Sequence, residues 1–529
     1  MSIDPSEGSG VPESDLRELA RRLSAVLRNL HELAQEHTRQ DTLASRLADH
    51  LGVDPRGLPV LSHEFPPYQL VDVQVALEAW QTAAPGRSSE VMGVAGDQRR
   101  FHPLSELVSG QQFGVGPGPV EYVDMADSPD TTRSCVRFGI FLLDDDGHPS
   151  AALLRGADPH GPMQSAMVEI IDADQDRGRA LMGELRRLAV EQSVLRGQVL
   201  SLGPGEGNQY GRMRFMHRPR LDREGLVLPD TTLAHIEGHV VGIAKHAARL
   251  KAAGQHLKRG VLLYGPPGTG KTHTVRYLLS QLTDMTAFVL SGQALGLIGQ
   301  ACALARVLQP SIVILEDIDL IAGDRSFGAI GSNPLLFEVL NQIDGLGDDV
   351  DVTFLLTTNR VDILERALAE RPGRVDAAVE IAPPDTEGRR RLLRLYGAPL
   401  GLGAMGDEEL QATVDVTENR TATYLREVVR RAALIAAEHQ PDGQLVLTGD
   451  LLAQAAQGLL GDRAALTRAL LGGAEEPDAE PPFTSPPGGS VMPVGSASNF
   501  GYFGARTAHR PLIAGGPGGQ EPKPFAPED

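Results

Sequence analysis

The chain has 529 residues, which is too long for one compact core and predicts three or four structural units. With 41% hydrophobic and 22% charged residues, the composition is that of an ordinary soluble protein. The formal net charge of −20 disfavours binding to nucleic acid and to acidic membrane surfaces, because both are polyanions that attract basic proteins.

Cysteine usage and the first residues of the chain give expectations about location. Cys135 and Cys302 lie far apart and form no CxxC pair, so neither a disulfide framework nor a sulfur metal site is predicted. The polar start has no basic stretch followed by an apolar one, as a secretion signal would, and no apolar run reaches membrane-spanning length. We therefore expect a soluble, cytoplasmic protein with no membrane partner.

Residues 1–62 are predicted to form a helical segment. Apolar residues alternate at spacings of three and four from Leu16 to Leu33, which indicates either a coiled coil or an amphipathic helix packed on its own domain. A second helical pattern follows from Leu43 to Leu51.

Residues 63–228 have the pattern of an α+β accessory domain that selects a partner. Short strand-like pieces such as residues 135–143 and 213–216 alternate with Gly and Pro, and a helix is expected around residues 177–195. Trp80 is expected to be a packing residue. No motif in this part indicates chemistry.

A complete phosphate-binding loop follows the predicted buried strand at residues 260–264. The sequence Gly-Pro-Pro-Gly-Thr-Gly-Lys-Thr occupies residues 265–272 and leads into a predicted helix at residues 273–282. Its glycines allow backbone N–H groups to converge on phosphate at a helix N-terminus. Lys271 is expected to reach the β and γ phosphates, and Thr272 to bind Mg²⁺.

Two further apolar runs end in polar residues suited to hydrolysis. Residues 311–315 precede Glu316 and Asp317, where one acid is expected to hold Mg²⁺ and the other to polarise the attacking water. Residues 352–356 lead to Asn359, whose amide is placed to orient that water or to contact the γ phosphate. Together with the phosphate-binding loop, the acid pair and the amide predict ATP hydrolysis.

In this order, the motifs of residues 229–470 resemble those of the AAA ATPases, in particular the main-line unfoldases. The resemblance also uses residues 236–238, residues 358–360, the run from Arg371 to Asp376 and residues 384–385. It implies a parallel-sheet P-loop ATPase domain at residues 229–384 and a helical lid at residues 385–471.

The resemblance also implies a homo-oligomer, usually a hexameric ring, with each ATP at a subunit boundary. Arg371 and Arg374 match the arginines that reach a neighbour's γ phosphate, although either could instead be a solvated loop residue. The expected catalytic residues are Glu316, Asp317, Asn359, Arg371 and Arg374, and the expected metal ligands are Thr272 and Glu316. The expected nucleotide contacts are Ile236, Gly238, Gly265, Pro266, Pro267, Gly268, Thr269, Gly270, Lys271, Thr272 and His273.

Four features depart from the family pattern. The acid pair reads Glu316 then Asp317, the reverse of the usual order, as in the mitochondrial AAA translocase of the folded Rieske protein. The segment before Arg371 is one residue longer. The loop expected to line the central pore reads Leu-Ile-Gly at residues 297–299 and lacks an aromatic residue, and Ala422 occupies a position that is usually Gly.

Residues 472–529 are rich in Gly and Pro and are predicted to be a disordered tail. Taken together, the sequence predicts an oligomeric ATPase, with ATP and Mg²⁺ as cofactors, that remodels, unfolds or disassembles a protein client. A nucleotide-gated scaffold with weak hydrolysis is the alternative. A nucleic-acid motor conflicts with the acidic balance.

Overall fold

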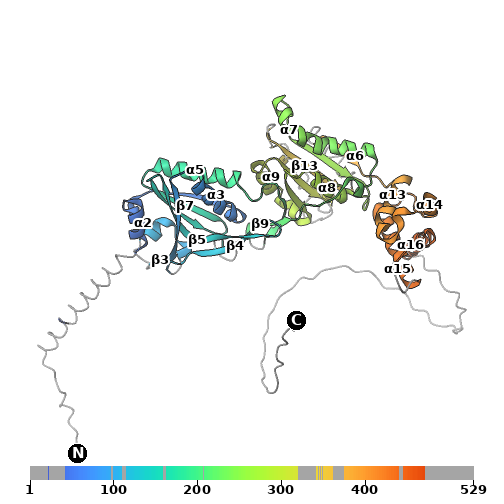
Figure 1. Cartoon of the computed structure of the whole chain (residues 1–529), viewed down its shortest axis with the longest axis horizontal. Coiled ribbons are helices and arrows are strands. Elements are labelled where there is room, and N and C mark those ends of the chain that lie inside the picture. The colour runs from blue at the N-terminus through green and yellow to red at the C-terminus, as the bar shows by residue number, and fades with distance from the viewer. Residues whose placement is uncertain are drawn as a thin grey trace, which may run out of the picture. The chain divides into compact units, whose positions relative to one another are not determined.

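The computed structural model describes residue 22 and residues 42–96, 99–109, 115–158, 163–205, 208–319, 341–342, 345, 347, 350–360, 375–439 and 445–470. The expected coiled coil, the expected tail, Arg371 and Arg374 lie outside the described residues. Two seven-stranded sheets and a group of helices make up the described part (Figure 1).

The first sheet is antiparallel and has the order β1-β7-β6-β5-β2-β3, with β4 also paired to β5. Its strands are β1 (Val60–Phe65), β2 (Arg87–Ala95), β3 (Gly116–Gly118), β4 (Glu121–Ala126), β5 (Thr132–Asp145), β6 (Pro149–Arg155) and β7 (Ala166–Asp172). The associated helices are α2 (Leu43–Leu51), α3 (Leu70–Thr82), α4 (Leu104–Ser109) and α5 (Gln175–Glu191). The α+β content predicted for this part is confirmed.

Helices cover both faces of the first sheet, which explains how strongly its strands are buried. Along β6, Ala151 and Leu153 pack in one cluster with α2 and α4, whereas Ala152 and Leu154 pack in another with α3 and α5. Trp80 of α3 belongs to the second cluster, so its predicted packing role is confirmed. The alternation follows from the two-residue period of a strand.

The second sheet has the order β14-β10-β13-β12-β11-β8-β9 and is parallel except for β9. Its strands are β8 (Val199–Gly205), β9 (Asn208–Met216), β10 (Arg259–Tyr264), β11 (Thr286–Ser291), β12 (Ser311–Glu316), β13 (Val352–Thr358) and β14 (Ala377–Glu380). The strands predicted around the phosphate-binding loop and the acid pair are confirmed. The hairpin β8–β9 falls within the range expected for the accessory domain, yet it extends this sheet.

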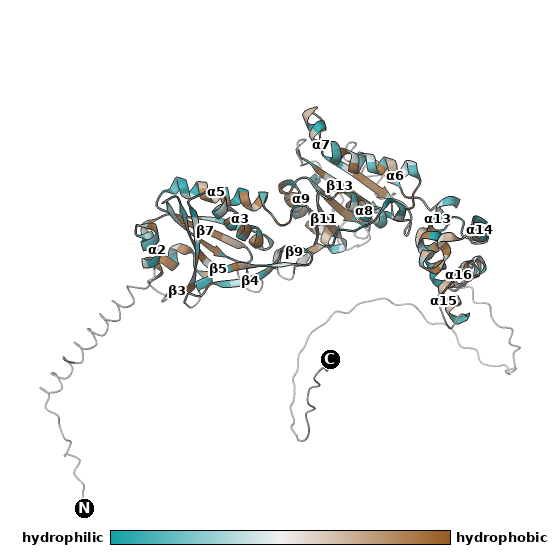
Figure 2. Ribbon diagram, in the orientation of Figure 1, coloured by the Kyte–Doolittle hydropathy of each residue, from teal (hydrophilic) through white to brown (hydrophobic). Residues whose placement is uncertain are grey.

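Both faces of the second sheet are also covered, because its strands are continuously apolar. Ile312 and Ile314 of β12 pack with α6 (Asp230–Glu237) and α8 (Lys271–Gln281). Val313 and Leu315 pack on the opposite face with α9 (Ile298–Val307). Figure 2 shows the hydrophobic strands of this sheet beneath helices whose outer sides are more polar.

A short π-helix at Gly238–Gly242 joins α6 to α7 (Ile243–Ala252), and a 3₁₀ turn at Gly292–Leu297 precedes α9. After β14, the helices α13 (Thr386–Gly397), α14 (Asp407–Val416), α15 (Ala422–His439) and α16 (Gly449–Leu470) follow. They share one apolar cluster that includes Leu393, Leu410, Val428 and Leu452, as the predicted helical lid requires.

Candidate functional site

The phosphate-binding loop connects β10 to α8 through a turn that only glycine accommodates. Gly265, Gly268 and Gly270 have φ angles of 142°, 82° and 115°. A Cβ at Gly265 would lie 2.4 Å from the carbonyl oxygen of Ile381, so the loop passes directly against the chain after β14. No side chain caps the first turn of α8, which leaves its N–H groups available to an anion.

Lys271, at the first position of α8, is folded back over the loop. Its Nζ donates to the carbonyl oxygens of Gly265 and Pro266, at 2.8 and 2.9 Å. Burial lowers the pKa of Lys271, while the nearby charges of Asp317 and Asp319 oppose that shift. The ammonium group therefore lies between the phosphate-binding loop and the acids that follow β12.

Glu316, the last residue of β12, lies against the start of α8. Burial raises the pKa of its carboxyl group, and the adjacent charge of Asp317 raises it further. A hydrogen bond from Thr272 and the charge of Arg276 act in the opposite direction. Thr272 and Glu316 thus bring a hydroxyl and a carboxylate oxygen together beside the loop.

The ends of β12 and β13 meet at the same edge of the sheet. Asn359 Nδ2 contacts Asp317 Oδ1 at 3.4 Å and Asp319 Oδ2 at 3.5 Å. Because β10 lies next to β13 and β13 next to β12, the carboxyl ends of these three strands converge on one place. The strand order therefore unites residues that are up to about ninety positions apart in the chain.

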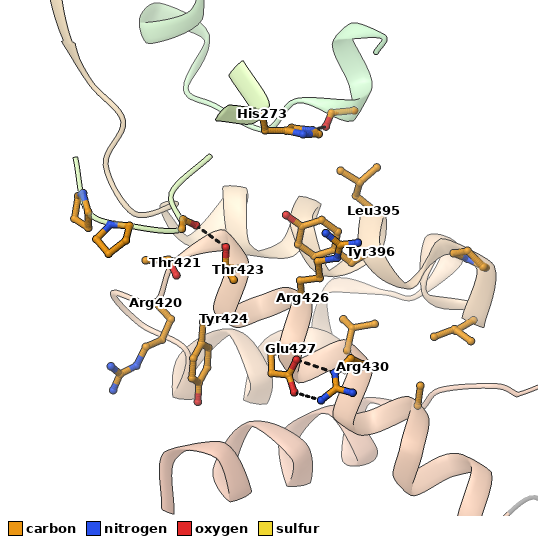
Figure 3. A pocket seen from close by; sticks show the side chains of 18 of the residues that line it. His273, Leu395, Tyr396, Arg420, Thr421, Thr423, Tyr424, Arg426, Glu427 and Arg430 are labelled. Atoms are coloured by element: carbon orange, nitrogen blue, oxygen red, sulfur yellow. Dashed lines mark hydrogen bonds and ion pairs between the residues drawn. The ribbon is translucent and has the colours of Figure 1, made fainter. Parts of the chain in front are cut away.

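An open groove of about 1530 Å³ runs from the phosphate-binding loop to α13 and α15 (Figure 3). Across it, the backbone N–H and the hydroxyl of Thr423 both donate to the carbonyl oxygen of Gly268, at 3.1 and 3.3 Å. His273 also lines the groove, and its Nε2 donates to the carbonyl oxygen of Gly225 at 3.0 Å. Tyr396 and Arg426 contribute from the lid.

The structure brings together most of the predicted site residues. The phosphate-binding loop, Thr272, the acid pair and Asn359 converge as described, and Pro266, Pro267, Gly268 and His273 line the groove. Ile236 and Gly238 do not line it. Ile236 is fully buried among the residues that pack α6 on the sheet, so it offers no surface to a nucleotide in this conformation.

Sequence reasoning missed three residues of this region. Asp319 and Thr357 hold the acid pair and Asn359 in place, and Thr423 connects the lid to the loop. The short spacing from Glu316 to Asp319 could have indicated Asp319. Nothing in the sequence alone indicates Thr357 or Thr423, because their partners come from other strands and helices.

The segment expected to line a central pore differs from that expectation. Ile298 is the first residue of α9 and is 1% exposed, packed in the same cluster as Phe288 and Leu315. Leu297 is partly buried against this cluster. The aliphatic residue of the predicted pore loop is therefore a core residue, because the 3₁₀ turn at Gly292–Leu297 turns it inward.

Residues 261–383 match the family profile of the ATPase family associated with various cellular activities (AAA). This segment is an AAA domain. Its parallel sheet, its phosphate-binding loop and the polar residues at the ends of β12 and β13 are the parts that the predicted P-loop fold required.

Curated relatives match a longer stretch of the chain. An ATP-dependent zinc metalloprotease FtsH of Mycobacterium tuberculosis is 30% identical over 305 residues, which cover 53% of this chain and 39% of the relative. A 26S proteasome regulatory subunit 10B homolog A of Arabidopsis thaliana is 35% identical over 196 residues, covering 35% of this chain and 48% of the relative. The chain thus spans less than half the length of these relatives.

Three further findings concern only the described residues. None of their helices is both long enough and apolar enough to cross a lipid bilayer. Among the same residues, no group of three or more His, Cys, Asp or Glu side chains is arranged to hold a metal ion. Cys135 and Cys302 are both buried free thiols.

Proposed function

We propose that this AAA domain binds Mg·ATP and hydrolyses it to ADP and phosphate. The observation that carries the proposal is the convergence of Lys271, Thr272, Glu316, Asp317 and Asn359 at the carboxyl ends of three adjacent strands. Such an edge is where parallel α/β sheets bind ligands.

The local chemistry fits the nucleotide and the metal. The uncapped start of α8 presents N–H groups to phosphate, and Gly270 has open space where a side chain would otherwise intrude. Thr272 and Glu316 supply the oxygen ligands that Mg²⁺ prefers, and they would hold it. When bound, Mg²⁺ supplies neutralisation of the phosphate charges.

Each protein group then has a defined task. Lys271 donates to the phosphates once its ammonium leaves the carbonyl oxygens of the loop. Asp317 accepts the proton of the attacking water, and Asn359 orients that water. Asp317 is one methylene shorter than the usual glutamate, so the aim of its carboxylate matters more for catalysis.

Assembly completes the proposed site. Arg371 and Arg374 of one subunit stabilise the charge that develops on the γ phosphate bound to its neighbour, in a homo-oligomeric, hexameric ring. ATP cycles then remodel, unfold or disassemble a protein client. The similarity to a named proteasome regulatory subunit supports this class of work, as does the AAA domain itself.

Steady-state ATP hydrolysis tests the assignment. Asp317→Asn and Arg374→Ala are expected to lower kcat by a factor of about 100 or more, because a positioned base contributes 10²–10⁴-fold and an arginine finger 10³–10⁵-fold. Asp54→Asn and Arg56→Ala, which alter an exposed ion pair of the first sheet's domain, are matched controls with unchanged kcat. Wild-type rates in both site variants would refute the assignment.

Mixing the two site variants tests the shared site. Asp317→Asn and Arg374→Ala subunits are each expected to be nearly inactive alone. In mixed assemblies, some boundaries combine an intact Asp317 with an intact Arg374, so part of the activity returns. If activity never returns although mixed oligomers form, the two residues do not act across a subunit boundary.

A nucleotide-gated scaffold remains the second candidate, and the burial of Ile298 favours it. Without an aliphatic side chain at the expected pore position, the chain has less to grip an extended polypeptide. ATP-dependent oligomerisation with slow, assembly-independent turnover would select the scaffold over the remodelling motor.

Two finer assignments rest on single features. The likeness to the translocase of the Rieske protein rests on the reversed order of Glu316 and Asp317 alone. A cytoplasmic location is supported by the two free thiols. FtsH is named a zinc metalloprotease, whereas these 529 residues contain no H-E-x-x-H motif, the pattern that binds zinc in such enzymes.

A further inference from the structure

The backbone at Asp317, directly after β12, leaves the extended conformation of the strand. Its φ angle is 50°, in the left-handed region that side chains with a Cβ rarely adopt. Two other described residues besides glycine, Asp146 and Asn419, share this feature, and neither lies on β12 or β13. Such a conformation costs about 1–2 kcal/mol and persists only where neighbours hold it.

Thr357 of β13 supplies that hold. The N–H of Asp317 donates to Thr357 Oγ1 at 2.9 Å, and the N–H of Ile318 donates to the carbonyl oxygen of Thr357 at 3.1 Å. The regular pairing of β12 with β13 ends at Leu315 and Leu356, two residues before Asp317 and one residue before Thr357. Beyond that point, the Thr357 hydroxyl, in place of a backbone carbonyl oxygen of β13, accepts the hydrogen bond from the N–H of Asp317. The Thr357 side chain is fully buried.

Asp319 holds the opposite side of the same turn. Its Oδ1 accepts hydrogen bonds from the Thr358 hydroxyl at 2.9 Å and from the N–H of Asn359 at 3.0 Å. Burial acts to raise the pKa of Asp319, but these donors outweigh it, so the pKa of Asp319 lies below its ordinary value. The carboxylate thus stays charged and keeps the end of β13 in register with the turn.

These hydrogen bonds fix the position of the Asp317 carboxylate relative to the amide of Asn359. The amide of Asn359 lies between the carboxylates of Asp317 and Asp319, at 3.4 and 3.5 Å. If the turn relaxed toward an extended backbone, the side chain of Asp317 would swing away from this amide, since successive side chains of a strand point to opposite faces.

We propose that Thr357 and Asp319 are positioning residues for the proposed ATP hydrolysis: Thr357 holds the left-handed turn that aims the short carboxylate of Asp317, and Asp319 fixes Asn359 beside it. This inference rests on the proposed function, because it concerns the aim of the base assigned there. Neither residue touches the reacting atoms. The arrangement offsets the missing methylene of Asp317 by fixing its backbone.

Thr357→Val and Thr353→Val form a matched pair that tests the role of Thr357. Both threonines are fully buried on β13, but among the described residues the Thr353 hydroxyl has no hydrogen-bond partner. Thr357→Val is expected to lower kcat by about 10- to 100-fold, as a displacement of 1 Å can. The Kd for a fluorescent ATP analogue should stay within about twofold, since the phosphate-binding loop is unchanged. Thr353→Val should leave both quantities unchanged.

The same assay tests whether serine can replace Thr357, and it tests the role of Asp319. Thr357→Ser keeps the hydroxyl and should recover most of kcat, and Asp319→Asn should lower kcat with little change in the Kd of the analogue. Thermal unfolding of each variant detects a general loss of fold. Equal kcat for Thr357→Val and Thr353→Val, or parallel loss of analogue binding and folding in Thr357→Val, overturns the inference.

The outcomes also separate this inference from the proposed function. If the wild type hydrolyses ATP and Asp317→Asn abolishes this activity, the proposed function stands. The comparison of Thr357→Val with Thr353→Val then decides whether the inference about Thr357 holds. If the wild type binds the analogue but shows no hydrolysis that depends on Asp317, both are refuted.

Discussion

At the scale of single residues, Lys271 shows how the site is prepared for an anion. Its ammonium group is held by two carbonyl oxygens of the phosphate-binding loop while the charges of two acids lie nearby. When a phosphate enters the loop, the ammonium group can exchange its hydrogen bonds to these carbonyl oxygens for hydrogen bonds to the phosphate, with little movement. The residue is therefore poised for an electrostatic contact and does not contribute to a packed core.

Lys271→Met tests this role. A hydrogen bond to a charged group contributes about 1.5–3 kcal/mol, so the Kd for a fluorescent ATP analogue should rise by about 10- to 100-fold. Lys245→Met, on the exposed surface of α7, is the matched control and should bind as the wild type does. An unchanged Kd in Lys271→Met would remove the lysine from the binding site.

At the scale of elements, the turn between β10 and α8 depends on close backbone contact. Gly265→Ala would place a Cβ 2.4 Å from the carbonyl oxygen of Ile381, at a positive φ. We expect a destabilisation of about 1–3 kcal/mol in urea unfolding, together with weaker nucleotide binding.

The control for this substitution is Gly183→Ala in the middle of α5. No atom lies within 4 Å of a Cβ at Gly183, and its backbone is helical. That variant should gain about 0.5–1 kcal/mol, because alanine favours a helix over glycine. Equal effects of the two substitutions would show that the turn at Gly265 is not constrained.

The start of α9 gives a second prediction at this scale. Ile298→Ala removes buried apolar volume and should lower the free energy of unfolding by about 2–5 kcal/mol. A residue that faced a central pore would instead affect client handling without changing stability. Urea unfolding therefore distinguishes the two, with the more exposed Leu297→Ala as the comparison that should cost less.

At the scale of the whole molecule, Asp72 joins two parts of the chain. It is fully buried on α3, and its Oδ1 accepts the N–H of Val194 at 2.9 Å, in the segment that connects α5 to β8. Burial raises the pKa of Asp72 to about 7, although the bonds from Val194 and Ser193 and the charge of Arg196 oppose the shift. The carboxyl group is thus more easily protonated in the folded chain than in the unfolded one.

This difference makes stability depend on pH. Because the folded state binds the proton more tightly, the contribution of Asp72 is fully present below about pH 4 and is lost as pH rises through about 7. We expect the unfolding midpoint to fall over that range, and Asp72→Asn to flatten the decline. Urea unfolding at several pH values measures both, and a decline that is unchanged in Asp72→Asn would assign it to other groups.

The sequence alone determined the chemistry of the site and the type of its main elements. The spacing of glycines and Lys271 after an apolar run requires a phosphate-binding loop, and the apolar runs before Glu316 and Asn359 require buried strands. These are local properties, set by a few neighbouring residues. Their order along the chain was also enough to indicate an AAA domain.

Only the tertiary structure decided how these pieces meet. Strand order brings Thr357 and Asn359 beside the acid pair and adds the hairpin β8–β9 to the sheet. Packing of α9 against β11 and β12 buries Ile298 in the core. Each of these outcomes depends on packing between segments that are distant in the sequence. Local patterns carry no record of such partners, because the hydrogen bonds and contacts that select them form only when the sheet assembles.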